Sequence, residues 1–341
     1  MTNQHDTIKI HNIDKTIVRI ALGTWAIGGS SWGGPDDDNA IKTIHAALDN
    51  GINMIDTAPV YGFGHAEEVV GKALKGKRDN IVLATKVGLN WDNSGKMFRD
   101  SSPKRIQKEI EDSLRRLNTD YIDLYQIHWP DDKTPIKETA QAMEKLRKEG
   151  KIKAIGVSNF STKQIEEFSQ YADLAAIQPP YNMFERSIEN DILPCAEKHK
   201  LATLCYGSIC RGLLSGKMNK DTKFTGDDLR KSDPKFQPPL FEHYLAATRD
   251  LEEYAQKNYN KSLLALAVRW VIDRYKGNIA LWGARKPQQI NGVQDALGWQ
   301  LTKEDYKKLD EILAKHIKLH QADKINWGVY SIIIKWNQRF Q

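Results

Sequence analysis

Short apolar runs alternate with longer amphipathic stretches along most of this 341-residue chain, and this alternation restricts the fold more than any other feature. Apolar runs of four to eight residues are typical of buried strands, and the stretches between them carry apolar residues at helical spacing. Repeated strand–helix units pair their strands in parallel through right-handed crossovers. The predicted strands cover residues 19–24, 52–56, 81–86, 121–128, 154–158, 175–178, 201–206 and 279–283.

Eight such units predict an α/β fold, a closed (β/α)8 barrel of TIM type with extra loops and a C-terminal extension. Chain length alone allows one barrel or two smaller domains, but the eight units favour a single domain over residues 1–341. The functional side chains of such barrels lie at the carboxyl ends of the strands. We therefore expect the functional site at those ends.

Helix boundaries support the same alternation. Ser102 and Pro103 precede an apolar helical stripe, where serine can cap the helix and proline fits its first turn. Gly51, Gly76 and Gly150 each follow a helical pattern, and glycine readily takes the left-handed conformation that closes a helix. The stripe consists of Ile106, Ile110, Leu114 and Leu117.

An open, doubly wound sheet is the alternative fold. Its usual evidence is a GxGxxG fingerprint in the first strand–helix turn, where glycines let the backbone approach a pyrophosphate. The glycine-rich segment 23–34 lacks that spacing, and Trp25 and Trp32 are too bulky for a close turn. A Walker A pattern is also missing, so the closed barrel is favoured.

Two segments interrupt the alternation. Residues 209–239 form a polar stretch long enough to be a functional lid or binding loop. The tail 320–341 is apolar from Trp327 to Trp336, and we expect it to pack against the barrel mouth, a helix or another subunit.

Composition narrows the class of protein. The net charge is +6, from 50 basic and 44 acidic residues, and the basic residues are dispersed among acids, which argues against a nucleic-acid partner. Cys195, Cys205 and Cys210 have neither metal spacing nor the number of a disulfide framework, so we expect buried or inert thiols in a reducing compartment. A secretory pattern and a membrane-length apolar run are both missing, which favours a cytoplasmic protein.

Four residues at or just beyond predicted strand ends suggest proton-transfer chemistry: Asp56, Tyr61, Lys86 and His128. A phenol titrates near pH ~10, and a neighbouring ammonium group favours the phenolate, so Tyr61 beside Lys86 can act as an acid near neutral pH. Lys86 needs a partner in a barrel mouth, and Asp56 is the obvious candidate. Each residue alone has a structural explanation, but four at successive strand ends favour a site that protonates a carbonyl oxygen.

The motifs around these residues resemble those of the aldo-keto reductase family, and in particular its bacterial subgroup typified by general stress protein 69. The resemblance covers about residues 15–315, whereas the tail after Leu319 has no counterpart. The matching motifs include Leu22-Gly23-Thr24-Trp25, Asp56-Thr57-Ala58, Tyr61-Gly62, Ala84-Thr85-Lys86, Gln126-Ile127-His128-Trp129-Pro130, Gly156-Val157-Ser158-Asn159-Phe160, Gln178-Pro179-Pro180-Tyr181-Asn182, Tyr206-Gly207-Ser208, Arg211-Gly212-Leu213-Leu214 and Trp282-Gly283-Ala284-Arg285-Lys286.

The resemblance implies an NADPH-dependent reductase that converts aldehydes and ketones to alcohols, an alcohol dehydrogenase (NADP+) type of activity. In that reading Tyr61 donates the proton, Lys86 lowers the pKa of the tyrosine, Asp56 orients Lys86, and His128 orients the carbonyl or assists proton relay. Ser158, Asn159 and Gln178 would then hydrogen-bond the nicotinamide carboxamide, for which their amide and hydroxyl groups are suited. The resemblance also suggests that the protein removes reactive carbonyl compounds under stress.

The resemblance also implies a cofactor groove. Tyr206 would stack on the nicotinamide, residues 207–213 with Ser215 and Lys217 would wrap the pyrophosphate, and Arg285 beside Arg230 and Lys286 would favour NADPH over NADH. Val293 stands where family members often have an acidic or amide residue, so an adenine contact would be missing. The full cofactor set is Thr24, Trp25, Asp56, Ser158, Asn159, Gln178, Tyr206, Gly207, Ser208, Ile209, Cys210, Arg211, Gly212, Leu213, Ser215, Lys217, Arg230, Gly283, Ala284, Arg285 and Gln289.

The substrate is predicted to be a small carbonyl compound. Trp25, Trp91 and Trp129 on predicted mouth loops would favour apolar or aromatic aldehydes, with Tyr61 and His128 at the reacting carbonyl. We expect a monomer or a weak homo-oligomer that binds neither membranes nor nucleic acid.

Two other classes remain as alternatives. One is a cofactor-sensing regulatory subunit that resembles the potassium-channel β subunits, which share the fold, although fold alone is weak evidence for function. The other is a metal-dependent barrel hydrolase built on His128 and Asp56. Lys86 would repel a divalent cation there, and a second histidine at ligand spacing is missing, so we expect no metal.

Overall fold

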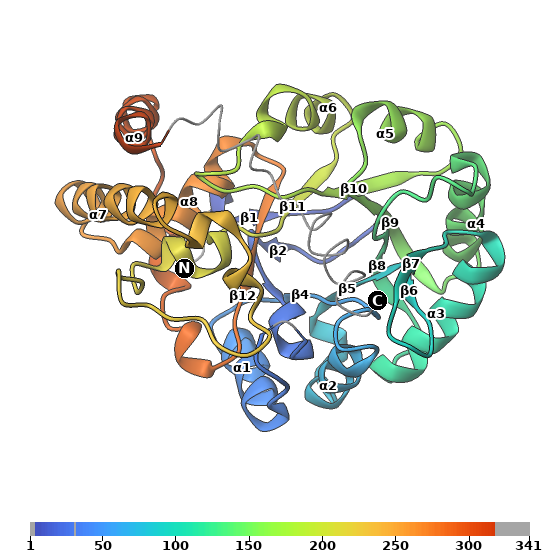
Figure 1. Ribbon diagram of the computed structural model, residues 1–341. Coiled ribbons are helices and arrows are strands. Elements are labelled where there is room, and N and C mark those ends of the chain that lie inside the picture. The colour runs from blue at the N-terminus through green and yellow to red at the C-terminus, as the bar shows by residue number, and fades with distance from the viewer. Residues whose placement is uncertain (1–3, 31, 318–341) are drawn as a thin grey trace.

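Eight parallel strands close into a barrel surrounded by helices in the computed structural model, which describes residues 4–30 and 32–317 (Figure 1). Each barrel strand pairs with the next along the chain, and the last pairs with the first. The prediction of a (β/α)8 barrel is therefore confirmed. The barrel strands are β3 (Ile20–Gly23), β4 (Met54–Asp56), β5 (Val82–Val87), β8 (Ile122–Ile127), β9 (Ile152–Ser158), β10 (Leu174–Gln178), β11 (Ala202–Cys205) and β12 (Asn278–Gly283).

Each predicted strand overlaps one barrel strand, and the bounds differ by at most two residues. Both faces of a barrel strand are covered, so β5 and β8 are buried along their whole length. Side chains such as Met54, Val82 and Leu124 fill the barrel interior. This packed interior closes the floor of any cavity at the strand ends.

The helices cover the outside of the barrel through their apolar stripes. In α3 the Ser102 hydroxyl accepts a hydrogen bond from the backbone N–H of Arg105 at 3.3 Å, and Pro103 begins the helix, as predicted. Gly51, Gly76 and Gly150 all have positive φ, as their closing positions require. The helices are α1 (Asp37–Asp49), α2 (His65–Ala73), α3 (Pro103–Leu117), α4 (Ile136–Lys148), α5 (Thr162–Phe168), α6 (Ile192–Lys198), α7 (Leu240–Tyr259), α8 (Leu263–Arg274) and α9 (Lys303–His316).

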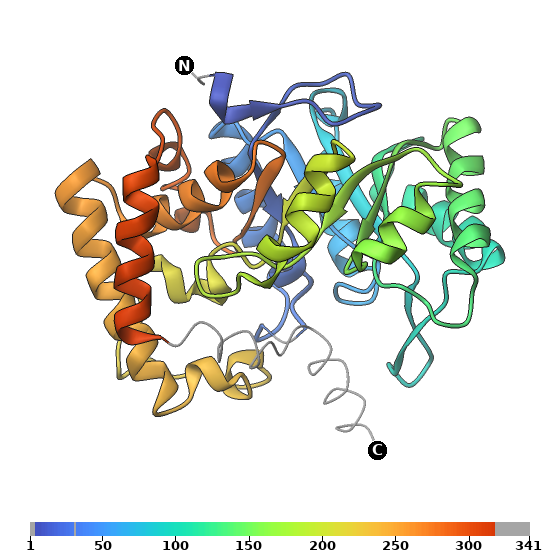
Figure 2. The same cartoon turned by 90° about the horizontal axis from the view of Figure 1, so that it is seen from above.

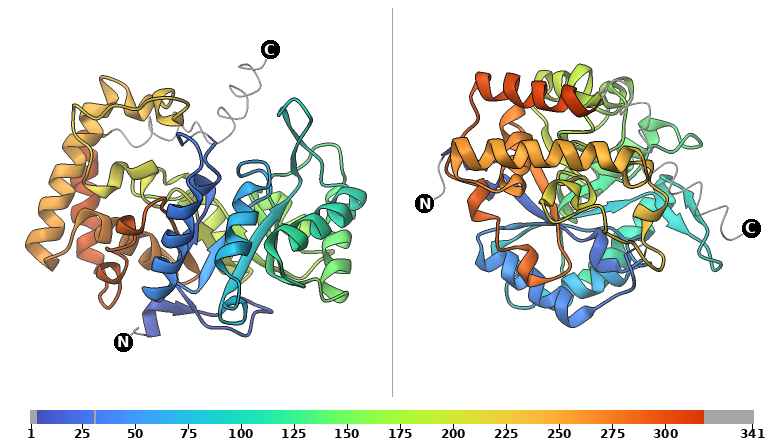
Figure 3. Two further views of the ribbon diagram at one scale, coloured as in Figure 1. Left: turned by 90° about the horizontal axis from the view of Figure 1, so that it is seen from below. Right: turned by 60° about the vertical axis from the view of Figure 1, so that its left-hand side comes forward.

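Helices α7 and α9 lie side by side on the outside of the barrel (Figure 3). Short 3-10 helices occur in several connections. They are η1 (Gln4–Asp6), η2 (Trp25–Gly28), η3 (Arg78–Asn80), η4 (Ser187–Asn190), η5 (Cys210–Ser215), η6 (Leu229–Lys231), η7 (Pro234–Phe236), η8 (Pro287–Gln289) and η9 (Gln294–Ala296).

The two ends of the barrel carry different additions. The hairpin of β1 (Thr7–Ile8) and β2 (Ile17–Val18) lies at one end, and the segment 209–239 lies at the other (Figure 2). That segment contains only η5, η6 and η7, which confirms the predicted irregular stretch. A second hairpin, β6 (Leu89–Trp91) with β7 (Met97–Arg99), follows β5.

Two further predictions concern the cysteines and the tail. Cys195, Cys205 and Cys210 are all free and buried, as expected. Burial raises the pKa of the Cys205 and Cys210 thiols, so both stay protonated. The predicted packing of the tail 320–341 lies outside the described residues.

Candidate active site

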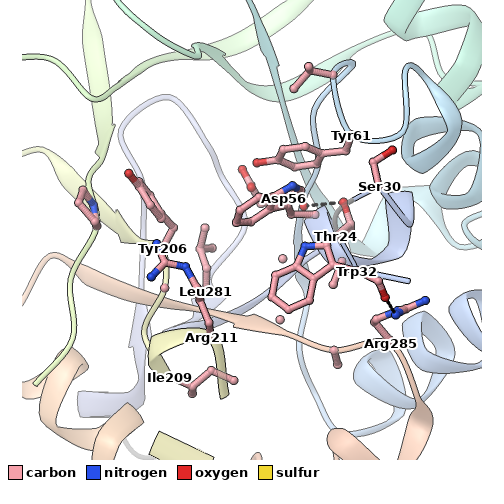
Figure 4. Close-up of a pocket in the computed structure, with 18 of the residues that line it drawn as sticks. Thr24, Ser30, Trp32, Asp56, Tyr61, Tyr206, Ile209, Arg211, Leu281 and Arg285 are labelled. Atoms are coloured by element: carbon pink, nitrogen blue, oxygen red, sulfur yellow. Dashed lines mark hydrogen bonds between the residues drawn. The ribbon is translucent and has the colours of Figure 1, made fainter. Parts of the chain in front are cut away.

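A cavity of about 490 Å³ opens at the carboxyl ends of the barrel strands, where the sequence predicted the site (Figure 4). Figure 4 shows Tyr206 and Arg211 on one side of this cavity and Ser30 and Arg285 on the other. The predicted residues that line it are Thr24, Trp25, Asp56, Tyr61, His128, Trp129, Ser158, Asn159, Gln178, Tyr206, Gly207, Ile209, Cys210, Arg211, Gly212, Arg230, Gly283, Ala284, Arg285 and Gln289.

Several predicted residues lie elsewhere. Ser208 is buried, with its hydroxyl turned to the Cys205 carbonyl at 2.8 Å, and Leu213 packs in the core. The Ser215 hydroxyl donates to the Gly212 carbonyl, and Lys217 is exposed. These four residues support the loop that lines the cavity but do not line it themselves.

Trp91 also lies outside the main cavity. Its ring packs against Phe63, with ring centroids 5.4 Å apart, and it lines a second pocket of about 190 Å³ together with Arg105, Glu109 and Arg116. Trp91 belongs to the β6–β7 hairpin that follows β5, and a side chain on such a hairpin can face away from the barrel mouth. Trp91 therefore does not line the main cavity itself, but it packs against Phe63, which does.

Lys86 lies directly beneath the cavity and joins Asp56 to Tyr61. Its Nζ donates to Asp56 Oδ2 at 2.6 Å, to the Thr57 carbonyl at 3.0 Å and to Tyr61 Oη at 3.2 Å. Lys86 and Asp56 are both buried, so this ion pair is shielded from solvent. The local geometry follows from the topology, because β4 and β5 are neighbours and Tyr61 lies on the loop after β4.

The charge state of this cluster suits proton donation. Burial is the largest single effect and opposes a positive charge on Lys86, but the charges and hydrogen bonds of Asp56 and Tyr61 together outweigh it, so the pKa of Lys86 is raised and the ammonium persists. Burial also raises the pKa of Tyr61, although Lys86 acts in the opposite direction. The net shift of the Tyr61 pKa is upward, which is opposite to the sequence prediction. That prediction considered the charge of Lys86 but not the burial of the phenol.

His128 completes the cluster in its neutral form. Burial, followed by the nearby Lys86 charge, holds the pKa of His128 well below its usual range. Its ring meets the Tyr61 ring edge to face, with centroids 5.8 Å apart. A neutral imidazole keeps one N–H donor, so His128 can hydrogen-bond a carbonyl oxygen without adding charge.

A group of polar side chains continues from Asp56 across the cavity floor. Gln178 Nε2 donates to Asp56 Oδ1 at 3.0 Å, and the Ser158 hydroxyl donates to the Gln178 backbone carbonyl at 2.8 Å. Asn159 has a left-handed φ of 62°, which turns its amide toward Tyr206 Oη at 2.9 Å. Together these residues form an amide-rich wall at the strand ends.

Three arginines line the cavity, and each is held by the protein. Arg211 forms an ion pair with Asp233 at 2.6 Å, and Arg230 binds the Asp228 carboxylate through two nitrogens. Arg285 donates to the backbone carbonyls of Trp32 and Gly34. The guanidinium groups are thus oriented before any ligand arrives.

Some lining residues were not predicted from the sequence. The apolar ones lie on short strands and loops without a distinguishing pattern, so the sequence carried little signal for them, whereas Asp36 carries a charge beside the predicted glycine-rich segment. The additional lining residues are Gly23, Ala26, Ser30, Trp32, Asp36, Val60, Gly62, Phe63, Leu89, Met97, Pro180, Glu185 and Leu281, and Lys286, which was expected to favour NADPH, lines the cavity too.

Metal binding and membrane insertion can be judged for residues 4–30 and 32–317. In this part of the chain no cluster of three or more His, Cys, Asp or Glu side chains is arranged to hold a metal ion. None of its helices is both long and apolar enough to cross a bilayer. Val293, the departure noted in the sequence, is fully buried and does not line the cavity.

The fold and this site define a (β/α)8 barrel with a buried acid–base cluster below an open groove. The same assignment follows from comparison with known proteins: the model of the aldo/keto reductase family matches residues 19–314. The chain belongs to the aldo-keto reductase family.

Its relatives include reductases and dehydrogenases. Aldo-keto reductase YhdN of Bacillus subtilis is 56% identical over 301 residues, covering 88% of this chain and 91% of that protein. The NADH-specific methylglyoxal reductase of Escherichia coli is 35% identical, covering 89% and 97%.

Similar solved structures support the same family assignment. The glycerol dehydrogenase AKR11B4 from Gluconobacter oxydans is 60% identical with a TM-score of 0.87, covering 92% of this chain and 97% of that one. An aldo-keto reductase from Klebsiella pneumoniae in complex with NADPH is 31% identical with a TM-score of 0.71, covering 90% and 94%.

Proposed function

We propose that this protein is an NADP(H)-dependent oxidoreductase that reduces aldehydes and ketones to alcohols, an alcohol dehydrogenase (NADP+) type of activity, with Tyr61 as the proton donor. The observation that carries the proposal is the buried chain from Asp56 through Lys86 to Tyr61, which ends at the cavity. A protonated tyrosine beside a fixed ammonium group can give up a proton because the ammonium stabilises the phenolate that remains.

Each residue of the cluster has a distinct role in this reading. Tyr61 protonates the carbonyl oxygen, and Lys86 holds the phenolate charge that develops. Asp56 keeps Lys86 charged and oriented, and neutral His128 donates a hydrogen bond that orients the carbonyl. A bound nicotinamide would supply the hydride that the carbonyl carbon accepts.

The groove residues fit such a cofactor. Ser158, Asn159 and Gln178 offer the hydroxyl and amide groups that a carboxamide needs, and the Tyr206 ring offers a flat surface for the nicotinamide. A β-carbon at Gly283 would meet nothing within 4 Å, so this part of the groove is open. The NADPH complex of the Klebsiella pneumoniae relative supports the same cofactor.

We propose NADPH in preference to NADH. Arg285, Lys286 and Arg230 bring three cations to one end of the cavity, where a 2′-phosphate would gain charge-assisted hydrogen bonds. Asp36 in the same region acts against a phosphate, and one relative is NADH-specific. The ratio of kcat/KM for NADPH to that for NADH measures this preference directly.

The proposed substrate is a small carbonyl compound. Trp25, Trp129, Phe63, Leu89 and Met97 line the cavity and favour an apolar or aromatic aldehyde. The likeness to a glycerol dehydrogenase and a methylglyoxal reductase adds short oxygenated carbonyls to the substrates worth testing. The proposal extends to a single-domain cytoplasmic enzyme, a monomer or weak homo-oligomer without a nucleic-acid partner, that removes reactive carbonyls under stress.

The decisive experiment follows NADPH consumption with an activated aromatic aldehyde, with NADH in parallel and with the Tyr61→Phe variant. We expect oxidation of NADPH, slower oxidation of NADH, and a loss of roughly 10²- to 10⁴-fold in the variant with cofactor binding retained. Tyr171→Phe, on the outer surface near Lys137, serves as the control and should keep full activity.

The outcomes separate the proposals. Full activity in Tyr61→Phe would remove the proton-donor assignment. Tight NADPH binding by the wild type without turnover of any carbonyl would instead favour the regulatory-subunit alternative, which the enzymatic relatives do not favour.

A further inference from the structure

Gln126 is fully buried on β8, does not line the cavity, and belongs to no role described so far. Its Nε2 donates to Asp56 Oδ1 at 3.1 Å, and its Oε1 accepts from Gln178 Nε2 at 3.3 Å. It therefore contacts both the acid of the catalytic cluster and an amide of the cavity floor.

The barrel makes a specific space for this side chain. Lys86, Gln126 and Gly156 are register partners across β5, β8 and β9, so they lie at one level of the barrel. A β-carbon at residue 156 would lie 2.7 Å from Gln126 Cγ, which is closer than a Cβ atom comes to a carbon atom to which it is not bonded. The absence of a side chain on Gly156 thus lets Gln126 lean over β9.

The hydrogen bonds fix the direction of both amides. A carboxylate only accepts hydrogen bonds, so Gln126 and Gln178 must each present Nε2 to Asp56. The Oε1 of Gln178 then has no partner among the described residues, and Gln178 lines the cavity. The amide of Gln178 consequently offers an acceptor to a ligand in the cavity.

We propose that Gln126 is a positioning residue: it holds the Asp56 carboxylate toward Lys86 and sets which end of the Gln178 amide faces the cavity. This inference rests on the proposed reductase function, since it links the carboxamide side of the site to the proton donor. Without Gln126, Asp56 Oδ1 loses one of its two amide donors and the Gln178 amide is free to turn.

The first test replaces Gln126 by methionine, which keeps the volume and removes both hydrogen bonds. Leu124→Met, a buried change two residues earlier on β8, is the matched control. In Gln126→Met we expect kcat to fall roughly 10-fold, because a buried hydrogen bond to a charged group is lost.

The readouts are chosen so that a merely structural loss would not produce them. Wild type should bind NADPH about 3- to 10-fold more tightly than the 3-acetylpyridine analogue, which lacks the carboxamide N–H, and Gln126→Met should lose this discrimination. The fall in activity at high pH should also move to higher pH, because Asp56 with one fewer donor opposes the Tyr61 phenolate more strongly.

A second pair of variants tests the route through Gln126. Gly156→Ala should push Gln126 aside and reproduce the Gln126→Met effects. In a Gln126→Ala background the same change should have a much smaller further effect, because the contacts that remain, Leu124 Cδ1 at 3.3 Å and the Ala176 carbonyl oxygen at 3.4 Å, are far less severe. Such non-additivity is expected only if residue 156 acts through residue 126.

The results distinguish this inference from the proposed function. If wild type neither binds NADPH nor reduces any carbonyl, the proposed function fails and the inference fails with it. If wild type is active but Gln126→Met keeps the cofactor discrimination and the pH profile of Leu124→Met, only the positioning role is overturned.

Discussion

Gly28 lies against the backbone of Tyr61 so closely that a β-carbon at residue 28 would stand 2.7 Å from the Tyr61 carbonyl carbon. The contact is reciprocal, since a β-carbon on Gly62 would meet the Gly28 carbonyl oxygen. The loop that follows β3 therefore fixes the loop that carries the proposed proton donor.

Gly28→Ala is expected to displace Tyr61, because the atoms in the way are backbone atoms that cannot rotate aside. A shift of about 1 Å at a catalytic group can lower kcat by about 100-fold, and overpacking of this kind lowers the free energy of unfolding by roughly 1–3 kcal/mol. Steady-state kinetics and thermal unfolding would measure the two effects.

Gly292→Ala is the control for that substitution. The nearest atom to its added β-carbon is 3.5 Å away, an ordinary contact, so stability and kcat should stay close to wild type. Unchanged kcat in Gly28→Ala would show that the Tyr61 loop tolerates displacement.

Asp56→Asn should separate the stability of the buried ion pair from its catalytic role. The change leaves the Lys86 ammonium without its carboxylate in a buried site, which costs roughly 3–5 kcal/mol of unfolding free energy. Activity should fall by about 10²-fold or more, since Lys86 no longer remains reliably charged beside Tyr61.

The double variant Asp56→Asn/Lys86→Met gives the matched comparison. Removing both charges relieves the uncompensated ammonium, so much of the stability should return while activity stays low. Denaturant unfolding with parallel assays would check this, and a double variant less stable than Asp56→Asn would contradict the account.

The fold was predictable because its determinants are local. The apolar run that ends at Lys86 and the Ser102 cap of α3 each show in a few consecutive residues, and the structure confirms the corresponding elements. Most of the residues expected to bind the cofactor also lie at the cavity, because the carboxyl ends of parallel strands converge in a barrel.

The remaining features depend on contacts between distant segments. From the sequence alone, Gln126 is simply one more buried residue of its strand. Only the strand register shows that it lies beside Gly156. The Gly33 N–H donates to Asp227 Oδ1, which brings together loops 194 residues apart in the chain. Trp91 was expected at the mouth, but its packing on Phe63 follows from a hairpin that the sequence did not reveal.

Asp36→Asn is expected to increase the preference for NADPH over NADH. Asp36 lines the cavity, and its pKa is lowered first by hydrogen bonds from Asn39 and then by the charges of Arg285 and Lys286. Removing an exposed acid near these cations should raise the ratio of kcat/KM for NADPH to that for NADH about two- to fivefold.

The asparagine keeps the helix cap, since its side-chain oxygen can still accept from the Asn39 N–H. Asp38→Asn removes one charge from the same turn of α1 but does not line the cavity, so it should leave the ratio unchanged. Equal effects of the two variants would mean that only the overall charge matters.

Glu109 should make the stability of the protein depend on pH near neutrality. Its Oε2 accepts from Arg105 Nε at 2.7 Å, its Oε1 has no partner among the described residues, and burial raises its pKa from 4.5 to about 7. Below pH 4.5 the carboxyl is protonated in both the folded and unfolded states, so its contribution to stability is fully present there. As pH rises from 4.5 through about 7, the unfolded state loses the proton first, and that stability is lost.

Glu109→Gln removes this ionisation while keeping the shape of the side chain. At 1.36 kcal/mol for each pH unit, the interval from 4.5 to about 7 corresponds to a loss on the order of 3 kcal/mol that the variant should not show. Urea unfolding at a series of pH values would therefore give a flatter curve for Glu109→Gln than for wild type. Glu111→Gln, an exposed change on the same helix, should retain the wild-type slope, and a wild-type slope in Glu109→Gln itself would place the source of the pH dependence elsewhere.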